Sequence, residues 1–408
     1  MAKADKSERK TKKIKLILIA DLVLLLIVAA AFFRYEYNHG LELNGSEYIS
    51  TELGQEYKDP GVRSPFAQTV NHVDVDTPGY YSVEYTLWGK HAVRRVHVVV
   101  PEKLVLGLKG SETQIVRQGD PYVESGAFAI DRSRGALNSS KISITGGVDT
   151  ETPGEYTVKY SVSSGDITKE KERKVKVVSR DQYMSCEEIP VMMYHWIYSQ
   201  DDLPDRIDGN WIEDIALEEH LRYLDQNGYY YPSWRELDAW IDGRIALPEK
   251  SIILTFDDGK KAFFEHGIPL FEKYKIPVTS FMICWEANDA ENKIKKYASE
   301  YIDIESHSYA MHQAGGVRGH KGRIAVMTKE EIKADLRAAS AMTGNNDAFA
   351  YPYGDYTLEG QEALSEQGIL CSFTIEYGKV VPGMDKTRLP RIRVMSTHTF
   401  ESWQDSIQ

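Results

Sequence analysis

Residues 252–259 read Ile-Ile-Leu-Thr-Phe-Asp-Asp-Gly, an apolar run that ends in two adjacent carboxylates and a glycine. A short β-branched and aromatic run bounded by a turn residue is typical of a buried strand. On a strand, Asp257 and Asp258 would point to opposite faces, but the glycine at its end lets the chain turn. We therefore expect both carboxylates to approach one site, although Asp-Asp-Gly is also typical of a solvated turn.

Other apolar runs end in the same way, in polar or backbone-exposing residues. The runs at 190–193, 302–304 and 348–351 lead to His195, His307 and Tyr353, respectively. Helical patterns alternate with these runs; one is the Leu217, Leu221 and Leu224 face, which Gly228 ends. The alternation predicts an α/β domain with a parallel sheet or barrel, in which active sites form at the C-terminal ends of the strands.

Two histidines follow the run that starts at Ile302. His307 and His312 are five residues apart, which on a helix would separate them by about 140°, so they are not a helical ligand pair. On a loop leaving a strand, both imidazoles can converge, and with Asp258 they would form a two-histidine, one-carboxylate set for a divalent metal. Taken alone, the two histidines could also be surface residues.

These motifs carry a resemblance to a known family. Thr255-Phe-Asp-Asp-Gly259, His307-Ser308 with His312, and Tyr351-Pro-Tyr-Gly354 resemble the first three motifs of the NodB-homology polysaccharide deacetylases, carbohydrate esterase family 4. The five-residue histidine spacing and the Tyr-Pro-Tyr-Gly form look closer to the poly-N-acetylglucosamine deacetylase branch than to the peptidoglycan branch. The resemblance implies a distorted (β/α) barrel over residues 188–408, and the opening at 189–195 is also similar to the start of many members.

The resemblance also implies roles for particular residues. Asp258, His307 and His312 would hold a divalent metal, with zinc the expected ion. Asp257 would be the general base, and the backbone N–H of Tyr353 would help to stabilise the oxyanion. A metal supplies activated water and polarises the acetyl carbonyl, which fits amide hydrolysis.

The chain departs from the family pattern at two points. Many members carry an arginine in the third motif that orients the base, and here that position is Ala350. The general acid is also open, with His195, His398 and the returning base Asp257 as candidates. Ser308 is expected to hold the histidine loop.

Several further polar residues are expected to lie outside the site. Asp355 is predicted to be a turn residue, His220 to be solvated, and His266 and His320 to lie on the surface. The three cysteines are widely spaced, so we expect isolated buried thiols.

The leading functional hypothesis is a metal-dependent hydrolase that removes N-acetyl groups from an extracellular polysaccharide containing N-acetylglucosamine, either peptidoglycan or poly-N-acetylglucosamine. The alternatives are a non-catalytic domain that binds wall glycan and an O-acetyl esterase on the same fold. The net charge of −12 makes nucleic acid an improbable partner. The predicted partners are an acetylated polysaccharide and the membrane, and no protein partner is evident.

The region before the catalytic domain contains an internal duplication. Residues 54–61 recur as residues 119–126, and residues 77–85 recur as residues 152–160. In the second pair of segments, tyrosine and valine alternate with polar residues at period two, as in a strand with one buried face.

The duplicated segments predict two small all-β sandwiches that resemble bacterial immunoglobulin-like (Ig-like) modules. They would span residues 40–101 and 102–179, followed by a linker near 179–187. We expect them to act as a spacer, with carbohydrate binding as the alternative.

The N-terminal region predicts a membrane anchor. Residues 16–33 form an apolar run just long enough for a transmembrane helix, behind a basic cytoplasmic tail at residues 1–15. Asp21 is an exception within the run, and Ala29-Ala30-Ala31 would also suit a cleaved signal peptide. The expected location is the cell membrane, as a single-pass protein with its catalytic domain outside the cytoplasm.

Overall fold

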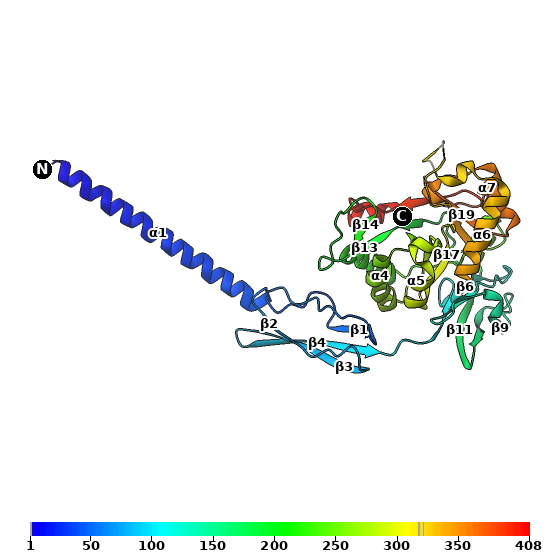
Figure 1. Ribbon diagram of the computed structural model, residues 1–408, viewed down its shortest axis with the longest axis horizontal. Coiled ribbons are helices and arrows are strands. Elements are labelled where there is room, and N and C mark those ends of the chain that lie inside the picture. Colours follow the sequence, from blue (N-terminus) through cyan, green and yellow to red (C-terminus); the bar gives the residue numbers. More distant parts are fainter. Residues whose placement is uncertain (1, 317–318, 321) are drawn as a thin grey trace. The chain divides into compact units, whose positions relative to one another are not determined.

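The computed structural model describes residues 2–316, 319–320 and 322–408, with side chains from residue 19 onward in those ranges. The chain forms two compact units, Met1–Pro101 and Glu102–Gln408 (Figure 1). The second unit contains both the predicted second Ig-like module and the predicted catalytic domain. These two parts therefore belong to one compact unit, and the spacer role stays a prediction.

The first unit consists of helix α1 (Ala2–His39) and one small β-sheet with the strand order β1-β4-β3-β2. Its strands are β1 (Tyr48–Glu52), β2 (Gln68–Asn71), β3 (Gly79–Leu87) and β4 (Lys90–Val99). The predicted alternation is confirmed, since Val83 and Tyr85 on β3 are fully buried.

The two-sheet sandwich predicted for this unit is not found in its described residues. Besides the sheet, they show a single β-bridge between Leu43 and Val62. Pro65 lies in the segment that corresponds to a strand in the second module, and it has no N–H for a sheet ladder.

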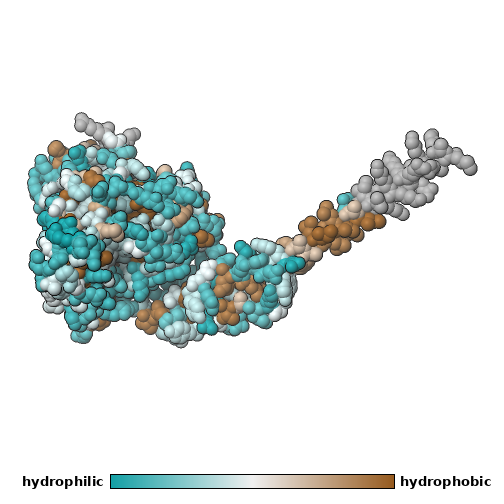
Figure 2. Space-filling view, turned by 180° about the vertical axis from the view of Figure 1, so that it is seen from behind, coloured by the Kyte–Doolittle hydropathy of each residue, from teal (hydrophilic) through white to brown (hydrophobic). Residues whose placement is uncertain are grey.

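The predicted anchor at residues 16–33 falls partly outside the described side chains, because those of residues 16–18 are not described. Within the side chains that are described, no helix is both long and apolar enough to cross a membrane. The large apolar side chains between Ile19 and Phe33 are exposed, and they form the brown stretch of the helix in Figure 2.

The second Ig-like module is a two-sheet sandwich at the start of the second unit. One sheet has the order β6-β11-β10-β9, and the other has the order β5-β7-β8. The strands are β5 (Leu104–Leu108), β6 (Thr113–Arg117), β7 (Ala127–Asp131), β8 (Gly135–Leu137), β9 (Ser143–Thr145), β10 (Gly154–Ser164) and β11 (Ile167–Val178).

A buried arginine organises each module in the same way. In the second module, the guanidinium of Arg173 donates to the Tyr160 hydroxyl and to the carbonyls of Lys109 and Gly126, at 3.2, 2.8 and 3.1 Å. In the first module, Arg94 makes the corresponding bonds to a tyrosine hydroxyl and to backbone carbonyls. The duplication therefore extends to a buried polar network, which the sequence comparison did not reveal.

The remainder of the second unit is a closed barrel of seven parallel strands, which confirms the predicted barrel. The barrel strands are β12 (Val191–Tyr194), β15 (Ile253–Asp258), β16 (Val278–Met282), β17 (Ile302–Ser306), β18 (Ala348–Ala350), β19 (Cys371–Tyr377) and β20 (Leu389–Arg393). Strand β20 closes the barrel by pairing with β12, and a small sheet of β13 (Trp196–Tyr198) and β14 (Trp211–Glu213) lies outside it.

Helices surround the barrel. They are α2 (Asp214–Gln226), α3 (Trp234–Ile241), α4 (Lys261–Tyr274), α5 (Ala290–Lys296), α6 (Lys329–Thr343), α7 (Leu358–Glu366) and α8 (Phe400–Ile407). The predicted face of α2 is confirmed, because Leu217, Leu221 and Leu224 are fully buried.

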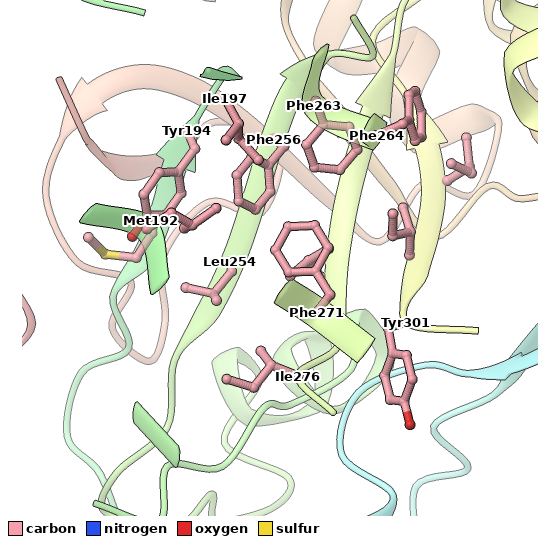
Figure 3. Close-up of a cluster of buried hydrophobic side chains, with 14 of the residues drawn as sticks. Met192, Tyr194, Ile197, Leu254, Phe256, Phe263, Phe264, Phe271, Ile276 and Tyr301 are labelled. Atoms are coloured by element: carbon pink, nitrogen blue, oxygen red, sulfur yellow. The ribbon is translucent and has the colours of Figure 1, made fainter. Parts of the chain in front are cut away.

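The outer core between barrel and helices sets which way the strand side chains point. Phe256 of β15 packs on Phe263 and Phe271 of α4, with ring centroids 4.8 and 5.3 Å apart (Figure 3). Because side chains alternate along a barrel strand, the neighbours Thr255 and Asp257 face the barrel interior.

One histidine expectation is wrong. His220, which we expected to be solvated, is buried, because helix α8 covers this side of α2. Its ring stacks on Trp403 at 4.0 Å, and its Nδ1 lies 3.1 Å from the Tyr194 hydroxyl. Burial lowers the pKa of His220 to about 3, so it is a neutral core residue. The three cysteines are buried and free, as expected.

We predict that Arg173→Met lowers the thermal unfolding midpoint of the full chain by roughly 3–5 °C. The substitution leaves buried carbonyls without donors, at a cost of about 3 kcal/mol. The neighbouring exposed Lys174→Met is the control, and it should leave the midpoint unchanged. Equal midpoints for the two variants, measured by circular dichroism, would contradict the assigned role of Arg173.

Candidate metal centre

Side chains from separate barrel strands converge at the C-terminal end of the barrel. Asp258, His307 and His312 each offer one ligand atom, and these atoms all lie within 4.8 Å of one another. Asp258 Oδ1 lies 3.7 Å from His307 Nε2 and 3.5 Å from His312 Nε2. The structure therefore brings together the three residues that were predicted to meet.

The spacing of these three donors fits a metal ion. Two ligands at about 2.1 Å from a tetrahedral ion lie roughly 3.4 Å apart, close to the distances observed here. The distances are also too long for hydrogen bonds, so the donors face a common space instead of bonding to one another. Burial, with the neighbouring His307, lowers the pKa of His312 to about 4, which keeps its imidazole neutral as a ligand must be.

Hydrogen bonds from outside the cluster orient two of the donors. His307 Nδ1 lies 2.7 Å from the carbonyl of Ala350 and donates to it, which leaves Nε2 free for a metal. Trp196 Nε1 donates to Asp258 Oδ2 at 2.9 Å, which leaves Oδ1 on the side of the imidazoles. Trp196 was not identified from the sequence.

The backbone is strained where it carries the site. Asp258, Ser308 and Tyr353 have φ values of 75°, 74° and 59°, in the left-handed region that residues other than glycine rarely adopt. Such residues concentrate at functional sites. We expected Gly259 to provide the turn after β15, and the turn in fact starts one residue earlier, at Asp258 itself.

The second carboxylate of the pair, Asp257, has different surroundings from Asp258. Its two oxygens accept hydrogen bonds from Arg391 Nη1 and Nη2, each at 2.7 Å, and both side chains are buried. Burial opposes ionisation of Asp257, but the Arg391 guanidinium outweighs it and holds the pKa of this carboxyl well below its ordinary value.

Arg391 orients Asp257, the role that an arginine of the third motif has in many members of the family. In this chain the third motif carries Ala350 instead. Arg391 reaches Asp257 from β20, and it is held by the Thr374 carbonyl at 3.1 Å and the Thr255 hydroxyl at 3.2 Å. Sequence reasoning missed it because residues 389–394 were not assigned to a barrel strand. The alternation of arginine and apolar side chains in this segment was the available signal.

The two histidines considered for the general acid lie in different places. His195 follows β12, and its buried Nδ1 has no hydrogen-bond partner among the described residues. Burial lowers the pKa of His195, against the charges of Asp257 and Asp258. By contrast, His398 is exposed before α8, where its Nδ1 accepts the Met395 N–H at 3.4 Å. The charges of Asp257 and Asp258 therefore act on His195, whereas His398 lies exposed before α8.

Tyr353 lies against the cluster of Asp258, His307 and His312. Its ring is 4.4 Å from the His312 ring, and burial, with the Asp258 charge, raises the pKa of its hydroxyl. Asp355 is buried and supports the loop that contains His320 and Gly322. Its carboxylate accepts hydrogen bonds from the backbone N–H groups of these two residues, each at 2.8 Å.

The loop that carries His312 is held by residues other than the one we expected. The Ser308 hydroxyl is buried without a hydrogen-bond partner in the described residues. Instead, the carboxylate of Asp335 on α6 accepts the N–H groups of Tyr309 and Ala310, both at 2.7 Å. His320 is exposed, as expected, and His266 is half-buried.

Comparison with known proteins gives two family matches. A family described as polysaccharide deacetylase matches residues 244–371, and one described as bacterial surface protein, Ig-like domain, matches residues 106–177.

Individual relatives have been named as deacetylases. The chain is 25% identical over 233 residues to a poly-beta-1,6-N-acetyl-D-glucosamine N-deacetylase of Staphylococcus epidermidis, covering 51% of this chain and 79% of that protein. It is also 25% identical over 205 residues to the enzyme of that name from Staphylococcus aureus, covering 47% of this chain and 69% of that protein. Among solved structures, Streptococcus pyogenes deacetylase PplD matches with a TM-score of 0.47 and 19% identity, over 54% of this chain and 98% of that one. The chain therefore contains a domain that matches the polysaccharide deacetylases, preceded by a domain that matches the bacterial surface Ig-like family.

Proposed function

We propose that the chain is a metal-dependent, extracytoplasmic enzyme that removes N-acetyl groups from a polymer of N-acetylglucosamine. The observation that carries the proposal is the juxtaposition of a three-donor cluster with a separate carboxylate, Asp257, that Arg391 keeps ionised. The names of the staphylococcal relatives support the N-acetylglucosamine polymer as the substrate class.

The donor set of Asp258, His307 and His312 would hold zinc, which supplies activated water and polarises the acetyl carbonyl. Asp257 accepts the proton that the attacking water loses, at one of its carboxylate oxygens. The Tyr353 N–H donates to the oxyanion that develops on the carbonyl oxygen.

The amide C–N bond then breaks, and the departing nitrogen takes a proton. We assign this proton transfer to His195, which would receive the proton that Asp257 took from the water and pass it to the nitrogen, since its buried Nδ1 has no partner among the described residues. The products are acetate and a glucosamine residue with a free amine.

The adjacent aspartates provide a matched test of the metal and base roles. We expect Asp257→Asn to retain zinc while its kcat/KM for acetate release from N-acetylglucosamine oligomers falls by about 10³, since it removes only the base. Asp258→Asn should lose both zinc and activity. Zinc content is measured by elemental analysis.

Three outcomes would contradict this assignment. The first is an Asp257→Asn variant that stays active. The second is loss of zinc from Asp257→Asn but not from Asp258→Asn, and the third is wild-type activity that survives removal of the metal by a chelator. Release of acetate from O-acetylated but not N-acetylated oligomers would point to the esterase alternative. No release from a zinc-loaded chain would point to a glycan-binding module.

We predict that Arg391→Met lowers kcat/KM by about 10² while zinc content stays unchanged, because Asp257 loses the partner that orients it and keeps it ionised. Arg388→Met is the control, since Arg388 is exposed and its partners, Asp385 and Tyr356, are not among the proposed site residues. Loss of zinc from Arg391→Met, or full activity in it, would count against the positioning role.

We also propose that the apolar part of α1 anchors the chain in a membrane. The exposed large apolar side chains from Ile19 to Phe33 support this, because a helix that is apolar all round requires an apolar environment. The basic residues before this stretch favour a cytoplasmic N-terminus.

In a bacterial host with a single membrane, the full chain should resist alkaline extraction, and protease added outside protoplasts should digest the deacetylase domain. Leu25→Arg should weaken retention, because a central arginine costs about 3 kcal/mol on insertion. A membrane-bound chain whose deacetylase domain is not digested by the external protease would contradict the proposed orientation.

A further inference from the structure

The second Ig-like module extends one side chain, Lys109, into the barrel. Its side chain is 1% exposed. Its ammonium lies 2.6 Å from Asp347, 2.6 Å from Asn345, 2.9 Å from Glu305 and 3.5 Å from Asp303. Asp303 and Glu305 belong to β17, and Asp347 directly precedes β18. One cation from the module therefore ties two neighbouring barrel strands together.

The seam between β17 and β18 has little backbone pairing of its own. Across the strands as described, a single pair, Ser306 with Phe349, joins them, whereas five pairs join β16 to β17. Side chains supply further contacts: Glu305 Oε2 accepts the Ala348 N–H at 3.2 Å, and Lys109 binds Glu305 Oε1. The seam therefore depends on carboxylates that Lys109 neutralises.

The same two strands set the orientation of His307. Because side chains alternate along β17, Asp303, Glu305 and His307 share one face of the strand. His307 donates to the Ala350 carbonyl at the end of β18. Lys109 and this hydrogen bond therefore hold opposite ends of one seam.

The internal duplication shows that the module itself does not need this lysine. The first module has Asn44 at the corresponding position. Arg94 donates to the Asn44 carbonyl at 2.7 Å, as Arg173 donates to the Lys109 carbonyl at 2.8 Å. Both modules thus use the backbone of this residue, and the cation serves the barrel.

We propose that Lys109 is a positioning residue of the metal centre, which acts through the β17–β18 seam on the orientation of His307. The inference rests on the proposed function, since it assumes that His307 is a metal ligand. Without Lys109, Glu305 and Asp303 would lose their cation, because the remaining neighbour, Arg235, is 3.4 Å from Asp347. Carboxyls buried without a cation take up protons, and the seam would lose the ionic tie between β17 and Asp347.

The test measures the zinc affinity of the full chain by competition with a chromophoric chelator, together with the thermal midpoint of the zinc-free protein. We expect Lys109→Met to raise the zinc Kd by about 10- to 100-fold, as loss of an orienting contact does in metal sites. Lys171→Met is the matched control, since it removes a partly exposed lysine that pairs the same module with Glu300 at 2.5 Å. The control should leave the zinc Kd unchanged.

A second variant separates metal binding from folding. Lys109→Met/Glu305→Gln removes the cation together with a fully buried carboxylate, so its thermal midpoint should recover even if Lys109→Met does not fold. Its zinc Kd should stay at least tenfold above that of the wild type, because the tie from β17 to Asp347 is still absent. A folded variant with the wild-type zinc Kd overturns the positioning role. A wild-type chain that binds no zinc overturns the proposed metal centre and the positioning role with it.

Discussion

The site depends on giving two adjacent carboxylates different surroundings. Asp257 keeps the direction that strand alternation assigns to it and forms a two-bond ion pair with Arg391 inside the barrel. Asp258 leaves that alternation through a left-handed backbone conformation, which costs about 1–3 kcal/mol, and so it faces the imidazoles. The aromatic packing of Phe256 on α4 holds β15 in the register that both arrangements need. A base that is not a ligand, beside a ligand set, is what metal-assisted hydrolysis requires.

The second Ig-like module and the deacetylase barrel form one packed unit. Val105, Phe128 and Ile130 of the second Ig-like module share the outer apolar core with barrel residues. Hydrogen bonds such as Ser125 to Glu236 join the two parts as well. The first module has the same buried arginine network but forms a separate unit with α1. Duplication has therefore produced two modules with different roles, of which one is built into the catalytic unit.

Local patterns were sufficient to predict the barrel strands that end in polar residues and the three converging donors. Each of these signals is contained in one short segment, such as residues 252–259. The sequence did not reveal Arg391, Trp196 or Lys109, because each acts on a residue more than 60 positions away in the chain. The prediction that His220 is solvated was wrong for the same reason, because helix α8, which covers it, is almost two hundred residues further along the chain. The first module forms one sheet, and Pro65, which has no N–H for a sheet ladder, lies where the second module has β7.

The central claim is that one ion is bound by two imidazoles and Asp258, while Asp257 lies beside it without binding it. X-ray absorption at the zinc edge of the zinc-loaded full chain tests this most directly. The account predicts a first shell of nitrogen and oxygen at about 2.0–2.1 Å, with the outer-shell scattering of two imidazole rings. A shell without imidazole scattering, or one with sulfur at about 2.3 Å, would contradict it.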